Sequence, residues 1–253
     1  MKISFFILLS VISFSCNGVN APESKAAPIS HSKWDTLLKK YVNEEGLVDY
    51  RGFQKDRELL NSYLELLQTS APNKKTWTKN EQLAFWINAY NAFTIALILD
   101  HYPVKSIKDI GSGPLITFIN SPWDIKFIEI GGKTYDLNNI EHGIIRKDFD
   151  DPRIHFALVC AAKSCPELRN EAYTGDQLNR QLEEETIAFI NNPERNKFLG
   201  NSAKLSKYFD WYKGDFEIGG KSVRDFINLY ATNKISGDTE IEYLEYNWEL
   251  NEQ

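Results

Sequence analysis

Apolar side chains recur every three or four residues in several stretches of the chain, which is the spacing of an amphipathic helix. A further helix is expected over 79–102, and its middle, 83–87, is apolar nearly all round, which indicates a helix buried in the centre of a domain. Thr78 and Glu81 have the spacing of a capping box at its start, and Pro103 predicts its end. The amphipathic helices are expected over 32–42, 56–67, 174–192 and 222–231, with shorter helices over 138–146 and from about residue 165.

Alternation of apolar and polar side chains predicts a few short strands. The segments 125–130 and 133–137 flank a Gly-Gly pair, and glycine supplies the positive backbone angles that a two-residue hairpin turn needs. The segments 153–160 and 241–248 also alternate. Since helices predominate, we expect an α+β fold: a mainly helical single domain around a small, mostly antiparallel sheet.

Residues 1–15 have the pattern of a signal peptide. Lys2 precedes an apolar run that is too short to span a bilayer. The run ends at Ser15 and Cys16, and a small residue before a cysteine at this place resembles the cleavage site of bacterial lipoproteins, in which the cysteine is acylated. Ordinary secretion, without lipid on Cys16, is the alternative.

The segment 16–31 is rich in Asn, Ala, Pro and Ser, the composition of a flexible tether, which leaves 32–253 as the globular domain. The expected location is therefore the bacterial cell envelope, on its periplasmic or surface side, with lipid on Cys16 as the membrane anchor.

Composition narrows the functional class further. The formal net charge of -6 and the pI of about 5.4 exclude the global positive field of a nucleic-acid binder, so no nucleic-acid partner is expected. A mean hydropathy of -0.41 excludes a polytopic membrane protein. Three cysteines are too few for a disulfide scaffold at this length. The substrate or protein partner stays open.

Asn88, Tyr90 and Asn91 interrupt the otherwise apolar surface of this central helix. The two amides are three residues apart and so share a helix face. A buried carboxamide must pair its donors and acceptors. The amides therefore either tie the helix to neighbouring loop backbone, or orient a catalytic base and stabilise an oxyanion.

Glu141 and His142 are adjacent in the predicted helix 138–146, with Arg146 one turn later. Successive α-helical side chains diverge by about 100°, so at most one of the first two can point straight into a given pocket. An ion pair is the simpler role for these residues. The spacing lacks the His-x-x-x-His pattern of zinc sites, and no metal or other cofactor is expected.

The stretch RIHFALVCAAKSCP, 153–166, contains the candidate nucleophile. On a regular strand His155 and Cys160 face opposite sides, and Cys160 has the character of a core residue. Cys165 precedes a proline at the predicted helix start, with a lysine two residues before it. A helix N-terminus and a nearby cation both stabilise a thiolate, so the pKa of Cys165 is expected to be lowered. His155 or His142 would then be the base.

A different interpretation pairs the two cysteines. A location outside the cytoplasm permits a Cys160–Cys165 disulfide, which would close a short loop. A redox-active pair is disfavoured because four residues separate the cysteines, where the thioredoxin-like motif has two.

The chain contains the motifs LAFWINAYN (83–91), IEH (140–142) with Arg146, and RIHFALVC (153–160) continuing to SCP (164–166). In this order they resemble the domain-of-unknown-function 547 family, and SKYFDW (206–211) and YNW (246–248) fit its bacterial members, so the resemblance extends over 34–251. Ala162 stands where the family usually has Ser. That family has no established biochemical activity, although some relatives are joined to glutaredoxin-like or coiled-coil segments. The resemblance implies that the first three motifs form one signature and gather around one pocket.

Two hypotheses of function follow. The first is a thiol-dependent hydrolase or acyl transferase on a peptide-like or small substrate, with Cys165 as nucleophile, a histidine as base, Glu141 orienting the imidazole, and Asn88 or Asn91 stabilising charge. The second is a non-catalytic binding or scaffolding lipoprotein with a structural cysteine pair. Its polar network would consist of Glu141, His142, Arg146, Arg153 and His155.

Overall fold

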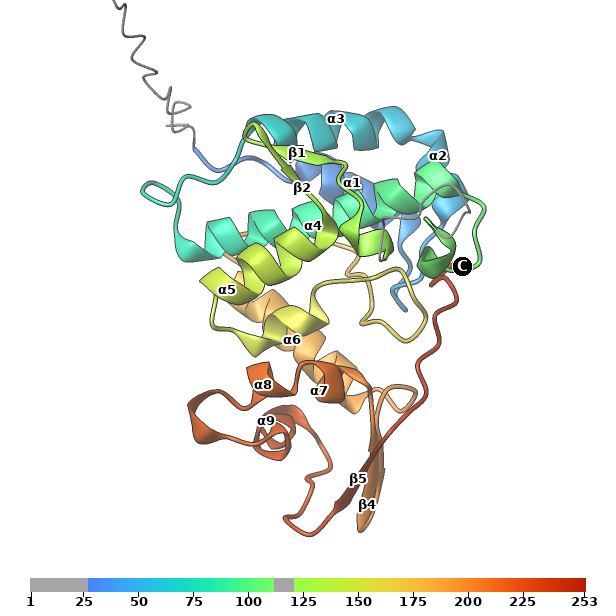
Figure 1. Ribbon diagram of the computed structural model, residues 1–253, viewed down its shortest axis with the longest axis vertical. Helices are drawn as coiled ribbons and strands as arrows, with labels where there is room; N and C mark the ends of the chain where they lie inside the picture. The colour runs from blue at the N-terminus through green and yellow to red at the C-terminus, as the bar shows by residue number, and fades with distance from the viewer. Residues whose placement is uncertain (1–26, 112–120) are drawn as a thin grey trace, which may run out of the picture.

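The computed structural model describes residues 27–111 and 121–253, and the predicted signal peptide with Cys16 lies outside the described residues. The fold is α+β and mainly helical, as predicted (Figure 1). The α-helices are α1 (Ser32–Tyr41), α2 (Tyr50–Lys55), α3 (Arg57–Thr69), α4 (Lys79–His101), α5 (Arg146–Asp148), α6 (Leu178–Asn191), α7 (Tyr208–Trp211), α8 (Lys213–Phe216) and α9 (Val223–Tyr230).

Shorter elements connect these helices. The 3₁₀ turns are η1 (Ile107–Asp109), η2 (Pro122–Asp124), η4 (Pro152–Phe156) and η5 (Ile218–Gly220), and η3 (Asn139–Ile145) is a π-helix. The strands are β1 (Ile128–Ile130), β2 (Lys133–Tyr135), β3 (Lys197–Leu199), β4 (Ser202–Leu205) and β5 (Glu240–Tyr243).

Helix α4 is the central element of the fold. The predicted capping box is present, because the Thr78 hydroxyl accepts from the Glu81 amide and the Glu81 carboxylate accepts from the Thr78 amide. Among the described helices, α4 is long and apolar enough to cross a membrane, but its apolar window is wholly buried inside the domain. The core helix of a soluble protein has the same composition, so α4 is weak evidence for a membrane span.

The strands form two small sheets where one had been predicted. Strands β1 and β2 are the predicted hairpin, with Ile128 opposite Tyr135. Gly131 and Gly132 have φ of 60° and 75°, as the turn requires. The second sheet has the order β3-β4-β5, in which β3 and β4 are antiparallel and β4 and β5 are parallel.

The buried apolar residues form two clusters. The larger surrounds α4 and includes α1 to α3 and the hairpin. The smaller joins the end of α6 to α7, α8, α9 and β4, around the ring of Phe156. In Figure 1 the second group lies below the first, with α6 running between them. The candidate site lies where the two clusters meet.

The C-terminal segment, residues 244–253, links the two groups. It leaves β5 at the bottom of Figure 1, runs upward and ends at the right of the picture, below α2. On the way, the Lys163 amide donates to the Glu249 carbonyl at 2.8 Å, and the Val48 amide donates to the Asn251 carbonyl at 2.8 Å. The Tyr50 hydroxyl donates to Asn251 Oδ1 at 2.7 Å. Hydrogen bonds therefore tie the C-terminal segment to residues of the larger cluster.

Two predicted elements around the cysteines are wrong. Residues 153–160 are not a strand, because Pro152 and the Asp151 side chain, which accepts from the Arg153 amide, start the 3₁₀ turn η4. Ile154, His155 and Phe156 are all buried, so the apparent alternation did not mark two faces. No helix begins near Cys165, and the next helix is α6.

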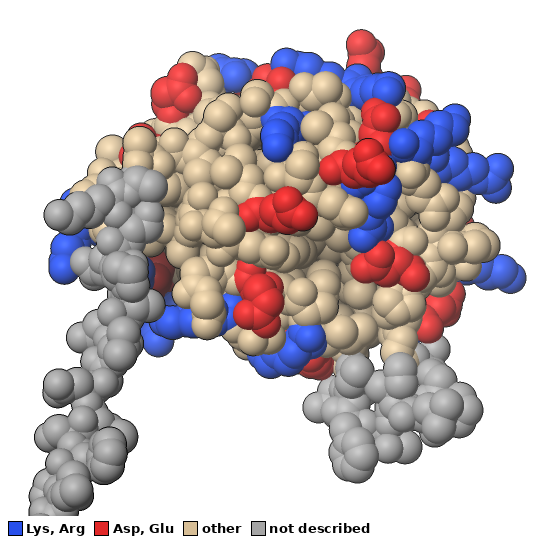
Figure 2. Space-filling model, turned by 90° about the horizontal axis from the view of Figure 1, so that it is seen from above, with Lys and Arg blue, Asp and Glu red and all other residues tan. Residues whose placement is uncertain are grey.

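Figure 2 shows the face seen from above Figure 1, over which acidic and basic side chains are interspersed. Among the described residues, many charged side chains pair locally, as Lys39 does with Asp35 and Lys40 with Asp56. Exposed pairs of this kind contribute little to stability.

Candidate functional site

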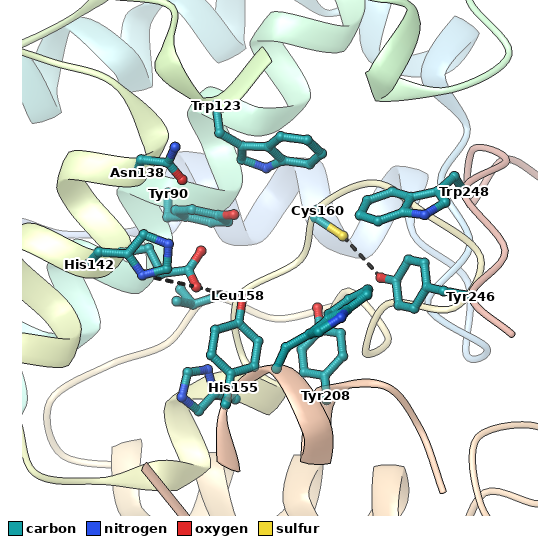
Figure 3. Close-up of a pocket in the computed structure, with 13 residues that line it drawn as sticks. Tyr90, Trp123, Asn138, His142, His155, Leu158, Cys160, Tyr208, Tyr246 and Trp248 are labelled. Atoms are coloured by element: carbon teal, nitrogen blue, oxygen red, sulfur yellow. Dashed lines mark hydrogen bonds and ion pairs between the residues drawn. The ribbon is translucent and has the colours of Figure 1, made fainter. Parts of the chain in front are cut away.

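A cavity of about 260 Å³ lies between the two core clusters, which is slightly below the range of about 300–1,000 Å³ typical of ligand pockets. Aromatic rings make up most of its wall, and Figure 3 shows them around a common space. We call it the aromatic pocket. Its lining residues are Tyr90, Trp123, Asn138, Glu141, His142, His155, Leu158, Cys160, Tyr208, Trp211, Tyr212, Tyr246 and Trp248.

Distant parts of the chain supply this wall. Helix α4 contributes Tyr90, and the turn η2 contributes Trp123. Tyr208 and Trp211 are the first and last residues of α7. Tyr246 and Trp248 belong to the C-terminal segment, which is how that segment closes the pocket.

Glu141 and His142, expected to diverge by about 100° on an α-helix, both line the pocket. The cause is the π-helical form of η3. A π-helix bonds each residue to the fifth one along, so its turn is wider and adjacent side chains diverge by less than 100°. Glu141 lies deeper, at 6% exposed, whereas the His142 side chain is 44% exposed.

Asp215, on α8, is the centre of a polar network that sequence reasoning missed. His155 Nε2 donates to Asp215 Oδ2 at 2.7 Å. Arg146 binds the same carboxylate through two hydrogen bonds, of 2.6 Å from Nε and 2.9 Å from Nη2. His155 and Arg146 together hold the pKa of Asp215 well below its usual range. We call these residues and His142 the Asp215 network.

The contact with Arg146 determines which ring nitrogen of His142 carries the proton. Arg146 Nη1 donates to His142 Nδ1 at 2.9 Å. A guanidinium has only donors, so Nδ1 must be a lone pair and His142 is the neutral tautomer with its proton on Nε2. Glu141 is bound differently, since the Tyr212 hydroxyl donates to its Oε1 at 2.8 Å.

His155 is fully buried against aromatic rings. Its ring stacks on Tyr212, with centroids 3.8 Å apart, and contacts Phe216. Burial lowers the pKa of His155, although the bond to Asp215 works in the opposite direction. His155 is therefore neutral, with its Nε2 proton directed at Asp215.

The two cysteines form a disulfide, so the prediction of a free, activated Cys165 thiolate is wrong and the alternative pairing is the one observed. Cys165 is 1% exposed and does not line the pocket. Cys160 does line it, contrary to the expectation of a core residue. The Tyr246 hydroxyl lies 3.2 Å from Cys160 Sγ and 3.3 Å from Cys165 Sγ (Figure 3).

The other candidates have supporting positions. Asn91 Nδ2 donates to the Ala157 carbonyl at 2.9 Å, and its Oδ1 accepts from the Val159 amide at 3.0 Å. Asn88 makes the equivalent two bonds to Tyr173. The amides therefore tie α4 to loop backbone. Arg153 binds Asp151 and does not line the pocket.

Sequence reasoning gave no role to most of the rings in the wall. The motifs SKYFDW and YNW did contain a signal, since they supply Tyr208, Trp211, Tyr246 and Trp248. Nothing in either motif indicates that the two segments lie side by side in the fold. Among residues 27–111 and 121–253, no group of three or more His, Cys, Asp or Glu side chains is placed to hold a metal ion.

Residues 74–190 match the model of a protein family described as "Protein of unknown function, DUF547". The match contains Glu141, His142, Arg146, His155 and the cysteine pair, whereas Asp215 and the rings of α7 and the C-terminal segment lie beyond it. Searches among curated proteins and among solved structures returned no match.

Proposed function

We propose that this chain, whose segment 74–190 belongs to the DUF547 family, binds a small organic ligand in the aromatic pocket. The observation that carries the proposal is the pocket itself: a wall of aromatic rings with a few polar groups, Glu141 and the His142 Nε2 proton among them. Such a mostly apolar cavity with sparse polar groups is the usual form of a ligand site.

The cysteine pair supports binding over thiol chemistry. A disulfide sulfur carries no thiolate to act as nucleophile. The pair instead braces the wall, because the Cys160 amide donates to Cys165 Sγ at 2.9 Å and the Tyr246 hydroxyl contacts both sulfurs. Ala161, between them in sequence, has φ of 59°, a left-handed conformation rare outside glycine.

A fragment screen by protein NMR, with tryptophan fluorescence as second readout, tests the proposal. We expect ligands that shift pocket resonances in the wild type to bind at least about fivefold more weakly to Trp211→Ala, because stacking contributes about 1 kcal/mol or more. Trp211 is 47% exposed, so its replacement should leave the fold intact. Leu229→Ala, at a 59% exposed apolar site outside the pocket, is the matched control.

A screen in which no fragment perturbs the pocket would contradict ligand binding. So would hits that bind Trp211→Ala and Leu229→Ala equally well.

The thiol-dependent hydrolase or acyl transferase is the second candidate, and one observation favours it. Cys160, His142 and His155 line the same cavity, as a nucleophile and its base must. An external dithiol would first have to reduce the pair. Iodoacetamide labelling between pH 5 and 9, with and without such a reductant, tests it: labelling of Cys160 or Cys165 no faster than that of a free peptide thiol rules it out.

We also propose that lipid on Cys16 holds the domain at the cell envelope, on the periplasmic or surface side. The support is the sequence pattern around Ser15 and Cys16. Metabolic labelling with an alkyne fatty acid is expected to label the wild type and not Cys16→Ser, which should leave the membrane fraction. A Cys16→Ser protein that keeps both label and membrane association would refute the anchor.

A further inference from the structure

We infer that the aromatic pocket selects a small organic cation, namely a quaternary ammonium or a methylated amine. The inference rests on the proposed function and adds the class of ligand. Two independent features carry it: the arrangement of the rings, and the charge that the wall presents.

The rings surround the cavity at different inclinations. Trp123 and Trp248 have centroids 5.8 Å apart with their planes at 66°, and Trp248 and Tyr246 are 4.5 Å apart at 51°. Trp211 lies 4.8 Å from Tyr246 at 49°, whereas Tyr208 and Tyr246, 6.3 Å apart at 21°, and Trp211 and Trp248, 5.9 Å apart at 27°, are closer to parallel. No flat ligand can lie parallel to all of these rings at once. Rings inclined to one another instead suit a compact, rounded group such as a trimethylammonium, which can meet several faces at once.

The charge of the wall is negative. Among the described residues that line the pocket, Glu141 is the one carboxylate, and neither lysine nor arginine is present. Two tyrosine hydroxyls from other elements lie around Glu141. Tyr212 donates to it, and Tyr90 is close enough for the carboxylate to help raise the Tyr90 pKa, so both phenols stay neutral.

The two basic side chains near Glu141, Arg146 and His142, leave its charge without a partner. Arg146 lies behind the Tyr212 ring, 5.2 Å from its centroid, but its charge is balanced by the two hydrogen bonds to Asp215. His142, 3.8 Å from Glu141 Oε1, is the neutral tautomer because Arg146 donates to its Nδ1. The Glu141 charge therefore has no dedicated cation in the wall.

A buried carboxylate without a cation partner is costly unless something else compensates it. A bound organic cation supplies that compensation, and the rings add cation–π attraction that is stronger in a desolvated site. An anionic ligand meets repulsion from Glu141 and no cation to hold it. The geometry thus favours positive charge over negative.

The test compares ligands of matched shape. Tetramethylammonium and choline are titrated into the full chain by calorimetry and tryptophan fluorescence, together with 3,3-dimethylbutan-1-ol, the uncharged carbon isostere of choline. We expect choline to bind at least about tenfold more tightly than the isostere. Glu141→Gln should remove that preference, and Glu129→Gln, which removes an equal charge outside the pocket, should keep it.

The outcomes separate this inference from the proposed function. Equal binding of choline and its isostere, or an unchanged preference in Glu141→Gln, overturns the cation inference and leaves ligand binding intact. Preferential binding of a neutral saccharide or an anionic fragment does the same. A pocket that binds no member of any class overturns both.

Discussion

Asp215 connects residues that come from three separate elements. Its carboxylate receives His155 from η4 and Arg146 from the start of α5, and Arg146 in turn holds His142 on η3. Charge-assisted hydrogen bonds of this kind are about twice as strong as neutral ones. The Asp215 network thus sets both the proton positions and the charge balance at one side of the pocket.

Replacing Asp215 with Asn should lower the free energy of unfolding by about 1–3 kcal/mol at neutral pH, because two donors lose a charged partner in a partly buried site. Urea denaturation measures the change. Asp210→Asn is the matched control on the neighbouring helix: Asp210 pairs with Lys207 at 3.7 Å on the surface, and its loss should cost less than about 0.5 kcal/mol. Equal costs for the two variants would mean that the network contributes no more than a surface pair.

His31, at the start of α1, should make stability depend on pH. Burial lowers the pKa of His31 from 6.5 to about 4, so between these values the folded state binds fewer protons than the unfolded state. The wild type should therefore lose stability as the pH falls through this window, by at most about 1.4 kcal/mol per pH unit. His31→Gln lacks this contribution.

The measurement is the difference in unfolding free energy between wild type and His31→Gln at several pH values from 7.5 to about 4, in which contributions of other groups cancel. A difference that stays constant with pH would contradict the lowered pKa of His31.

Single residues also mark the limit of sequence reasoning. Glu141, His142, Arg146 and His155 stand out by type and do gather at one site. Asp215 lies in an ordinary charged stretch, and nothing local distinguishes it from its neighbours. Its role comes from the packing of α8 against η4, which no local pattern encodes.

At the scale of elements, strong hydrophobic periodicity and characteristic turn residues predicted helices and turns correctly. The capping box of α4 and the Gly131-Gly132 turn have local causes, and both were predicted. The strand predicted over 153–160 is wrong because its apolar residues are buried on every side, so their alternation carried no information about strand faces. Tertiary burial outweighed local preference there.

Helix α4 positions two loops through its amides, and this gives a matched pair of variants. Asn91→Ala removes the hydrogen-bond partners of the Ala157 carbonyl and the Val159 amide. Asn88→Ala removes those of the Tyr173 carbonyl and amide. Each should destabilise the fold by about 2–4 kcal/mol, because buried backbone groups are left unpaired. Only Asn91→Ala should also weaken ligand binding, since its loop leads directly to Cys160 in the pocket wall.

Denaturant unfolding and ligand titration of both variants check this. Equal effects of the two variants on binding would show that the loop does not determine the shape of the pocket.

At the scale of the whole molecule, the C-terminal segment completes both the core and the site. Chain ends usually tolerate truncation, but here Asn251 is buried and pairs with both Val48 and Tyr50.

Truncation after Glu249 should lower the free energy of unfolding by about 3 kcal/mol or more. Gln253→Ala, which removes one side chain from the end of the segment, should cost less than about 1 kcal/mol. Thermal unfolding of both proteins makes the comparison, and a truncated protein as stable as Gln253→Ala would refute the role of the segment.

The position of Trp248 in the wall has a consequence for biosynthesis. A nascent chain that ends before Trp248 lacks part of the pocket wall, and the amides of Lys163 and Val48 lack their partners until Glu249 and Asn251 have been added. Ribosomes add residues in order, so early segments cannot reach their final arrangement while translation continues. The wall of the aromatic pocket is therefore completed only after nearly all of the domain has been synthesised.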